Sequence, residues 1–384
     1  MVTKNIGKIE PSPTLELAAK AKQLQSAGVS VIDLSLGEPD TITPEHIRRA
    51  AILSIKKGFT HYTNTAGVLE LREAITKKLL TENKVKYTPK EVVIGVGSKQ
   101  LLYHAFQVLC EKGDEVLLPV PTWSTYFEQI KLSKATPVLV RLKPPFKLKA
   151  SDLLEKTTSK TKVILLNTPS NPTGAVIEKK ELEKIADIAV KKNIFVISDE
   201  IYEKILYSGK HYSIVSFGHD IKQQTITING FSKAYAMTGW RVGYAAGPEE
   251  IIESMVALQS QTTSNTSSIS QMAALAAING PQKSVHLMLK DLKRRRDIIL
   301  KLLFEIDGLF ITRPEGAFYL FVGIEKLLNK KYPTSSIWCT KLLEEKGVAL
   351  VPGEAFLYPR YFRLSFTNSI TNISEAVSRI KSFI

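Results

Sequence analysis

The chain has 384 residues, of which 44% are hydrophobic and 23% are charged, a balance typical of soluble globular proteins. This composition excludes a disordered, collagen-like or coiled-coil protein, and the length suggests two or three domains of roughly 150 residues each. The longest apolar runs, at 163–166 and 194–197, are far shorter than the roughly 20 residues that cross a bilayer, so the sequence predicts no membrane span.

The N-terminal segment 1–14 carries charge but has neither the apolar core nor the small-residue cleavage site of a secretory signal, which predicts a cytoplasmic protein. The two cysteines, Cys110 and Cys339, lie far apart, and neither is close in sequence to a second thiol or a histidine pair. We therefore expect neither a disulfide framework nor a metal site.

The formal net charge is +15, and the densest basic run is 293–296. Such a run can indicate nucleic-acid binding. Here it lies between Leu289, Leu292 and Ile299, which mark an apolar helix stripe, so we expect the basic residues mostly on the solvated face. The pattern predicts no nucleic-acid partner, and a positive field suits anionic small molecules equally well.

From about residue 92 to residue 247, short apolar strands alternate with segments of helical periodicity, including 98–113 and 178–193. This order is typical of an α/β protein with a doubly wound, mostly parallel sheet, in which ligands bind beyond the carboxyl ends of the strands. The predicted strands are 91–96, 114–119, 136–142, 162–167, 194–199, 225–230 and 241–247.

After Pro281 the alternation stops, which indicates a separate, smaller α+β unit. We expect the N-terminal residues, with a helix near 15–27, to join this unit. The predicted domains are therefore 45–280, the large one, and 1–44 together with 281–384. The elements expected after Pro281 are a long basic helix, two strands around 315–322, a helix at 338–346, strands at 348–353 and 361–366, and a last helix.

Polar residues follow three of the predicted strands: Asp199, Asn171 and Lys233. Because the carboxyl ends of parallel strands lie along one edge of the sheet, these three side chains should face one crevice. Taken singly, each also has an ordinary structural interpretation: a cap, a turn residue before a proline, and a surface lysine.

Taken together, several motifs resemble the pyridoxal-phosphate aminotransferases of fold type I, class I/II, and most of all the bacterial aspartate aminotransferases. The motifs stand in the family's order from about Pro11 to the C-terminus. They are LGEPD (36–40), HYTNTAGVLELREA (61–74), NTPSNPTG (167–174), ISDEIY (197–202), GFSKAYAMTGWRVGY (230–244) and YFRLS (361–365).

The resemblance implies roles for residues around the cofactor ring. Lys233 would form a Schiff base with the cofactor aldehyde and later move a proton as a general acid and base. Asp199 would face the pyridine nitrogen and keep it protonated. Asn171 and Tyr202 would donate hydrogen bonds to the ring 3′-oxygen, and Trp123 would stack on the ring.

For the cofactor phosphate, the resemblance implies a helix N-terminus and the guanidinium of Arg241. Ser232 is a further candidate, although in related proteins the hydroxyl can sit two positions earlier, where this chain has Gly230. Tyr62 matches a tyrosine that reaches the phosphate of the neighbouring subunit, which implies a homodimer. The residues implied at the helix N-terminus are Gly97, Ser98 and Lys99.

For the substrates, the resemblance implies that Arg363 clamps the α-carboxylate, with the backbone of Gly37 as a second contact and with Asn171 and Trp123 close by. The ordinary interpretation of Arg363 is an edge-strand arginine facing solvent. We expect L-aspartate and 2-oxoglutarate as substrates and oxaloacetate and L-glutamate as products.

The distal carboxylate needs a cation, and the segment 260–268, where larger relatives supply an arginine, contains none. Lys99 is the candidate, with Thr14, Ser264 and Asn265 as hydrogen-bond donors. Aromatic amino acids or prephenate are alternative substrates; relatives that accept prephenate tend to carry a basic residue where this chain has Glu10.

Three other classes of function share some of these sequence features. A dinucleotide-binding G-x-G-x-x-G motif fails because Gln100 stands where its third glycine would be. A transcription regulator that reuses this fold needs a preceding DNA-binding domain, and the resemblance already begins at Pro11. A lyase, decarboxylase or racemase would keep the cofactor and change the reaction, and only measured turnover separates it from an aminotransferase.

Overall fold

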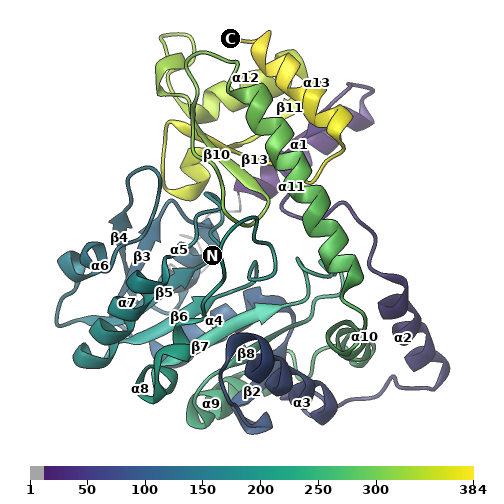
Figure 1. The fold of residues 1–384 in the computed structure, drawn as a ribbon, viewed down its shortest axis with the longest axis vertical. Coiled ribbons are helices and arrows are strands. Elements are labelled where there is room, and N and C mark those ends of the chain that lie inside the picture. Colours follow the sequence, from purple (N-terminus) through teal and green to yellow (C-terminus); the bar gives the residue numbers. More distant parts are fainter. Residues whose placement is uncertain (1–12) are drawn as a thin grey trace, which may run out of the picture.

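The computed structural model describes residues 13–384, and a seven-stranded sheet forms the centre of its larger part (Figure 1). Strands β3 to β7 run parallel to their neighbours, whereas β8 lies antiparallel between β2 and β7. The prediction of a mostly parallel α/β sheet is confirmed. The spatial order is β2 (Val92–Gly95), β8 (Gly243–Ala246), β7 (Thr225–Gly230), β6 (Phe195–Asp199), β5 (Thr161–Asn167), β3 (Glu115–Val120) and β4 (Thr136–Arg141).

Helices cover both faces of this sheet, which explains why its strands are continuous apolar runs. Along β5, Ile164 and Leu166 pack with one layer of helices, whereas Val163 and Leu165 pack with the other. The first layer contains α2 (Glu45–Lys56), α3 (Leu69–Lys78), α6 (Ala150–Lys156), α7 (Lys179–Lys192), α8 (His219–Gln223) and α10 (Ser268–Asn279); the second contains α4 (Gly97–Leu109), α5 (Ser124–Leu132) and α9 (Glu249–Ser260).

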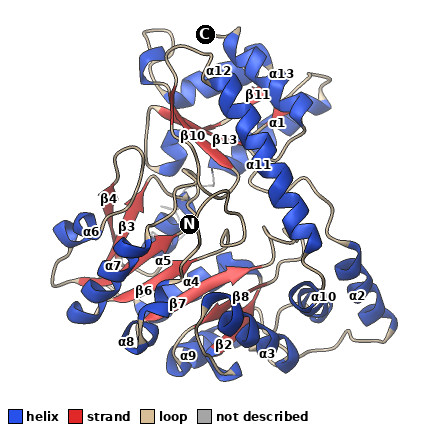
Figure 2. Ribbon diagram, viewed as in Figure 1, coloured by secondary structure: helices blue, strands red, loops and turns tan. Residues whose placement is uncertain are grey.

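A second, four-stranded antiparallel sheet lies in the other part of the molecule, together with the first and last helices of the described chain (Figure 2). Its order is β12 (Val351–Pro352), β13 (Tyr361–Ser365), β10 (Tyr319–Gly323) and β9 (Phe310–Ile311). The helices of this part are α1 (Pro13–Ser26), α11 (Lys283–Leu303), α12 (Ser335–Lys346) and α13 (Ile370–Lys381).

The N-terminal segment is joined to this second part by a short parallel pairing, in which β1 (Ile32–Asp33) lies beside β11 (Val348–Ala349). A small apolar cluster of Ala21, Leu343 and Ala349 fixes α1 next to it. The domain boundaries themselves, 45–280 against 1–44 with 281–384, stay a proposal.

The basic run on α11 differs from the prediction of a mostly solvated face. Its first two residues are exposed, but the Arg295 side chain is only 11% exposed and pairs with Asp40 at 2.8 Å. Arg296 is 3% exposed and stacks over the ring of Tyr207 at 4.5 Å. The prediction is therefore wrong for these two arginines, because α11 runs between the two parts of the molecule and they bind neighbouring segments (Figure 1).

The two cysteines are free thiols, and both are buried. Among the helices of residues 13–384, none combines the length and the hydrophobicity that crossing a membrane requires.

Candidate active site

A cavity of about 300 Å³ opens beyond the carboxyl ends of the central strands, with residues of the second sheet in its wall. It brings together most of the side chains that the sequence motifs singled out, although they come from segments spread along the whole chain. The predicted residues that line it are Gly37, Ser98, Lys99, Trp123, Asn171, Asp199, Tyr202, Ser232, Lys233, Arg241 and Arg363.

The three strand-end residues meet as expected. Asp199 is the last residue of β6, and Asn171 and Lys233 follow β5 and β7, which flank it. All three line the cavity. Their shared position follows from the parallel order of the sheet, which places successive carboxyl ends side by side.

Asp199 is a buried carboxylate with two hydrogen-bond donors. Its side chain accepts from the Tyr126 hydroxyl at 2.7 Å and from the backbone N–H of Ile201 at 3.2 Å. Burial raises the pKa of Asp199 to about 6, although both donors favour the ionised form. At neutral pH the group is an anion with little solvent around it, which suits a cationic partner.

Lys233 is the central amine of the cavity, and its Nζ donates a hydrogen bond to the carbonyl oxygen of Gly37. Burial lowers the pKa of Lys233 to about 8, and the positive charges of Arg363 and Arg241 act in the same direction. A substantial fraction of this side chain is therefore a neutral amine under mildly alkaline conditions, as a nucleophile or general base requires.

Arg363 is fixed from several sides. It lies on β13, between β10 and β12, and is 2% exposed, so it is not a solvent-facing edge residue. Its Nη1 donates to Oδ1 of Asn171 at 3.1 Å, and its Nη2 donates to the carbonyl of Ser35 at 2.6 Å. The ring of Tyr319 lies 4.4 Å from the guanidinium carbon. Nε of Arg363 is buried and has no hydrogen-bond partner among the described residues.

A second cationic region lies where α4 begins. Arg241 packs so closely on Gly97 that a Cβ there would lie 2.5 Å from Nη2, and Gly97 has φ +73, a conformation that glycine adopts easily. Lys99 follows in the first turn of α4, and burial and the charge of Arg241 lower its pKa. Cations and helix N–H groups together form a typical phosphate-binding arrangement.

The structure shows which hydroxyl groups lie near Gly230, where related proteins can have a hydroxyl that contacts the phosphate. A Cβ at position 230 would lie 2.9 Å from Oγ of Ser98, so Ser98 fills the space that a side chain there would need. Ser98 donates to the carbonyl of Asn229 at 3.0 Å, and Ser232 lines the cavity. Ser98 and Ser232 therefore place the hydroxyls that position 230 lacks.

Aromatic rings form the remaining walls. Trp123, directly before α5, has Nζ of Lys99 at 4.8 Å from its ring centroid. The hydroxyls of Tyr202 and Tyr319 are hydrogen-bonded at 2.9 Å, and burial raises the pKa of Tyr202 far above its usual value. Both phenols are therefore neutral at physiological pH and able to donate.

Two residues predicted to contact the cofactor phosphate do not line the cavity that the described residues of the single chain form. Gly97 lies behind Arg241, and Tyr62 is 91% exposed on the surface. The side chain of Thr14 lies outside the described part of the chain, as does Glu10. Ser264 and Asn265 are also absent from the cavity wall, and the Asn265 amide donates to the carbonyl of Thr266 at 2.8 Å.

Sequence reasoning missed four wall residues: Tyr126, Ile201, Thr238 and Tyr319. Tyr126 had a usable signal, since it stands three positions after Trp123 and so shares its helix face. Tyr319 had none, because only the folding of the second sheet over the first brings it to Tyr202.

The residues present fit pyridoxal phosphate, the cofactor that the sequence resemblance implies. The close contact of Arg241 with Gly97 forms an anion cradle that a larger residue at 97 would obstruct. A buried carboxylate, Asp199, suits a protonated ring nitrogen, and Lys233 is an amine with a lowered pKa. The cavity also has room for a small amino acid beside Arg363.

Comparison with known proteins agrees with this chemistry. A family model described as aminotransferase class I and II matches residues 29–380. The chain is 43% identical to an aspartate aminotransferase of Bacillus sp. (strain YM-2), over 100% of this chain and 99% of the relative. It is 45% identical to a probable aspartate/prephenate aminotransferase of Aquifex aeolicus, over 98% and 96% of the two chains.

Among solved structures, the aspartate aminotransferase of Thermus thermophilus with maleate superposes with a TM-score of 0.96 at 37% identity, over 100% of both chains. Family, relatives and fold thus agree along the whole chain. The chain belongs to the class I and II aminotransferases, pyridoxal-phosphate-dependent enzymes of fold type I that transfer amino groups between amino acids and oxo acids.

Proposed function

We propose that the protein is an aspartate aminotransferase, which transfers the amino group of L-aspartate to 2-oxoglutarate and yields oxaloacetate and L-glutamate. One observation carries the proposal. A single cavity is lined by the Lys233 amine and by two cationic groups, Arg363 and Lys99, which suit the two carboxylates of a dicarboxylic amino acid. Arg363 has a buried donor left over, and within the described residues no carboxylate pairs with Lys99.

In this proposal the cofactor ring is held by Asp199, Asn171, Tyr202 and Trp123. The burial of Asp199 supports its role, since an anion with little solvent stabilises a positive ring nitrogen strongly. The neutral phenol of Tyr202 supports its role as a donor. The cofactor phosphate is assigned to Gly97, Ser98, Lys99, Ser232 and Arg241, with Tyr62 of a second subunit.

Bound pyridoxal phosphate supplies an electron sink for the pair released when the substrate Cα–H bond breaks. Lys233 is the catalytic residue that moves the proton. With a pKa near 8, about a tenth of its side chains carry a neutral Nζ at pH 7, and that nitrogen takes the proton and later returns it. Burial is the main cause of the lowered pKa of Lys233, and the positive charges of Arg363 and Arg241 act in the same direction.

Substrate orientation is assigned to Arg363. Its contacts to Asn171 and Ser35 hold the guanidinium plane, so an α-carboxylate bound there has one orientation. A fixed carboxylate directs the Cα–H bond toward Lys233 and makes reaction at the other α-bonds less frequent. The Gly37 carbonyl already accepts from Lys233, and its backbone is the second contact in this assignment.

The distal carboxylate is assigned to Lys99, with Thr14 as a further donor. Lys99 is partly buried beside Trp123 and Arg241, which destabilises its charged form. A bound anion would stabilise that charge. The names of relatives support a dicarboxylate: several are aspartate aminotransferases, and the Thermus thermophilus structure contains maleate, itself a dicarboxylate.

Prephenate is a second candidate acceptor, because relatives from Aquifex aeolicus and Rickettsia prowazekii are named probable aspartate/prephenate aminotransferases. Both share more than 40% of their residues with this chain. Prephenate also carries two carboxylates, so Arg363 and Lys99 suit it as well. Aromatic amino acids stay a weaker alternative, since they leave Lys99 without a partner.

We also propose a homodimer with shared active sites, located in the cytoplasm. Tyr62 is 91% exposed in the single chain, and α2 nearby presents the apolar side chains Ile52, Leu53 and Ile55, each more than half exposed. Exposed apolar side chains gathered on one helix are typical of an interface. Size-exclusion chromatography with light scattering tests the dimer.

A panel of amino donors tests the substrate proposal. Purified holoenzyme is assayed with aspartate, glutamate, phenylalanine, alanine and leucine, each with 2-oxoglutarate or oxaloacetate, and in reverse with prephenate as acceptor. The proposal expects kcat/KM for aspartate to exceed that for alanine and leucine by at least about tenfold to a hundredfold, the value of one charged hydrogen bond. Equal or greater turnover of an apolar or aromatic donor contradicts it.

A further inference from the structure

The turn after β6 has a second face that the proposed mechanism does not use. Asp199 and Tyr202 point into the cavity, but Glu200 and Glu203, which alternate with them, do not line it. Glu200 is 0% exposed, and the Glu203 side chain is 9% exposed. Two buried carboxylates directly behind the site need partners, because an unpaired buried charge is strongly destabilising.

Glu203 is bound by residues of the segment that includes α3. Nζ of Lys78, whose side chain is 6% exposed, forms an ion pair with Glu203. Nδ2 of Asn83 donates to the other carboxylate oxygen at 3.0 Å, and Lys78 also donates to Oδ1 of Asn83 at 2.7 Å. Burial alone would raise the pKa of Glu203, but Lys78 and the other donors hold it at about 2.

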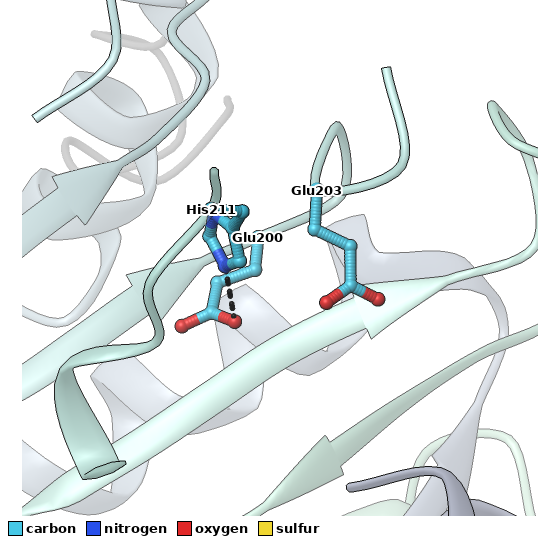
Figure 3. A group of neighbouring side chains, drawn as sticks. All are labelled: Glu200, Glu203 and His211. Carbon is cyan, nitrogen blue, oxygen red and sulfur yellow. Dashed lines mark hydrogen bonds and ion pairs between the residues drawn. The ribbon is translucent and has the colours of Figure 1, made fainter. Parts of the chain in front are cut away.

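Glu200 is bound by the loop that follows. Its carboxylate is 3.0 Å from Nε2 of His211, and it accepts from the hydroxyls of Ser213 at 2.6 Å and Ser198 at 3.0 Å. Figure 3 shows the His211 ring against Glu200, with the Glu203 carboxylate beside them. Burial would lower the pKa of His211, but the Glu200 carboxylate raises it above its ordinary value.

Glu200, Glu203 and His211 carry ligand atoms within 4.8 Å of one another, a grouping that could in principle hold a metal ion. The cation is already present, however, because Lys78 is paired with Glu203 and His211 with Glu200. A metal ion would need to displace the Lys78 ammonium from a buried position. The cluster is therefore better described as two paired carboxylates, one bound by the Lys78 ammonium and the other by the His211 ring.

Buried charge pairs add little net stability, since the desolvation of both ions offsets their attraction, but they can select one geometry. Each pair here fixes one end of the five-residue turn 199–203 from behind. We propose that the two pairs, Lys78–Glu203 and His211–Glu200, are positioning residues that hold Asp199 and Tyr202 in the orientation that the cofactor requires. This inference rests on the proposed assignment of Asp199 and Tyr202.

The test compares Glu203→Gln, which leaves Lys78 charged and unpaired, with the double variant Lys78→Met and Glu203→Gln, which removes both charges. The matched control is Glu249→Gln, whose carboxylate pairs with the exposed Lys90 at 3.0 Å. For each protein we measure the melting temperature without cofactor, the Kd for pyridoxal phosphate by equilibrium dialysis, and the pH dependence of the absorbance of bound cofactor.

If the pairs position the turn, Glu203→Gln raises the Kd about tenfold to a hundredfold, the loss expected for a charged hydrogen bond. The double variant then recovers the melting temperature but keeps a Kd at least about fivefold weaker than wild type, because the turn is still unanchored. In both variants kcat falls while KM for aspartate changes less than about twofold, since Arg363 is untouched.

A Kd within about twofold of wild type in both variants overturns the inference, and so does a Kd that recovers together with the melting temperature. If Glu203→Gln does not fold, the double variant and Asn83→Ala provide the same Kd comparison. Failure of the wild-type protein to bind pyridoxal phosphate contradicts the proposed function instead. Glu200→Gln with and without His211→Asn repeats the comparison for the second pair.

Discussion

The hydroxyl of Tyr126 donates a 2.7 Å hydrogen bond to the carboxylate of Asp199, and neither residue is more than 2% exposed. Even with this donor, burial raises the pKa of Asp199 to about 6. The ionised carboxylate is thus destabilising in the chain alone and favourable once a cation faces it. The charge of Asp199 therefore lowers the stability of the cofactor-free protein, although the proposed function requires that charge.

The first prediction follows from that conflict. In the protein without cofactor, Asp199→Asn should raise the free energy of unfolding at pH 7 by about 1–3 kcal/mol, because the variant buries no charge. The folded pKa of about 6 lies above the unfolded value of about 3.9, so wild-type stability falls as the pH rises between them. Urea unfolding from pH 4 to pH 7 measures both effects.

The same variant should bind pyridoxal phosphate at least about tenfold more weakly, since the lost partner is a charged one. If the free energy of unfolding changes with pH in the same way in wild type and variant, Asp199 does not carry the raised pKa. Tyr126→Phe serves as a control that keeps the carboxylate and removes one donor.

A second prediction concerns the side-chain amine of Lys233. Because the pKa of Lys233 is about 8, an acylating reagent should label it half-maximally near pH 8 in the cofactor-free protein, whereas ordinary exposed lysines require a pH near 10. Peptide mass spectrometry after brief labelling across pH 6–10 measures this. Saturating pyridoxal phosphate should protect the Lys233 peptide, and labelling that follows the exposed lysines contradicts the prediction.

Replacing Arg363 with lysine keeps the positive charge and removes the planar array of N–H donors of the guanidinium. Lysine lacks the planar guanidinium that contacts Asn171 and Ser35 and would hold a carboxylate in one orientation, so KM for the amino donor should rise about tenfold to a hundredfold. Cofactor affinity should change less than about threefold. Arg313→Lys, at a side chain that is 65% exposed, is the control. Steady-state kinetics measure KM for the amino donor. An unchanged KM would show that Arg363 does not bind the substrate.

Lys99→Ala addresses the distal carboxylate. Turnover of aspartate should fall about tenfold to a hundredfold, and turnover of an apolar donor should fall far less, because only aspartate loses a charged partner. Lys112→Ala, at an exposed position after the other end of α4, is the control. Equal losses with both donors would mean that Lys99 serves the phosphate alone.

The shared-site hypothesis makes a prediction about mixtures. Tyr62→Ala and Lys233→Ala should each be inactive or nearly so, but mixing them should restore activity, up to about a quarter of wild type if half of the molecules are hybrids with one intact site of two. Subunit exchange is followed separately with tagged chains. Exchange without any recovered activity counts against a site that uses Tyr62 of the neighbouring subunit.

The sheet and its edge were predictable because local patterns determine them. The seven predicted strands are apolar runs bounded by polar residues, and parallel order alone places Asp199, Asn171 and Lys233 together. Motifs then identified most of the other cavity residues, down to Arg363 on the second sheet, but not Tyr126, Ile201, Thr238 or Tyr319.

The partners of those residues were not predictable in the same way. That Tyr126 donates to Asp199, or that Lys78 pairs with Glu203, depends on which helix faces which side of a turn. Arg296 was expected on a solvated face and is buried, because its helix is covered by segments that approach from elsewhere in the chain. Periodicity identifies the face of a helix but not what that face meets.

The hydrogen bond from Arg363 to the carbonyl of Ser35 joins residues 328 positions apart. Contacts of such long range form late in folding, because the entropy of a very large loop must be lost first. A nascent chain can therefore complete most of its central sheet before the carboxylate clamp exists. The proposed clamp is complete only when the N-terminal segment has docked onto β13, so a loss of substrate affinity in an otherwise folded protein would indicate that this docking is disturbed.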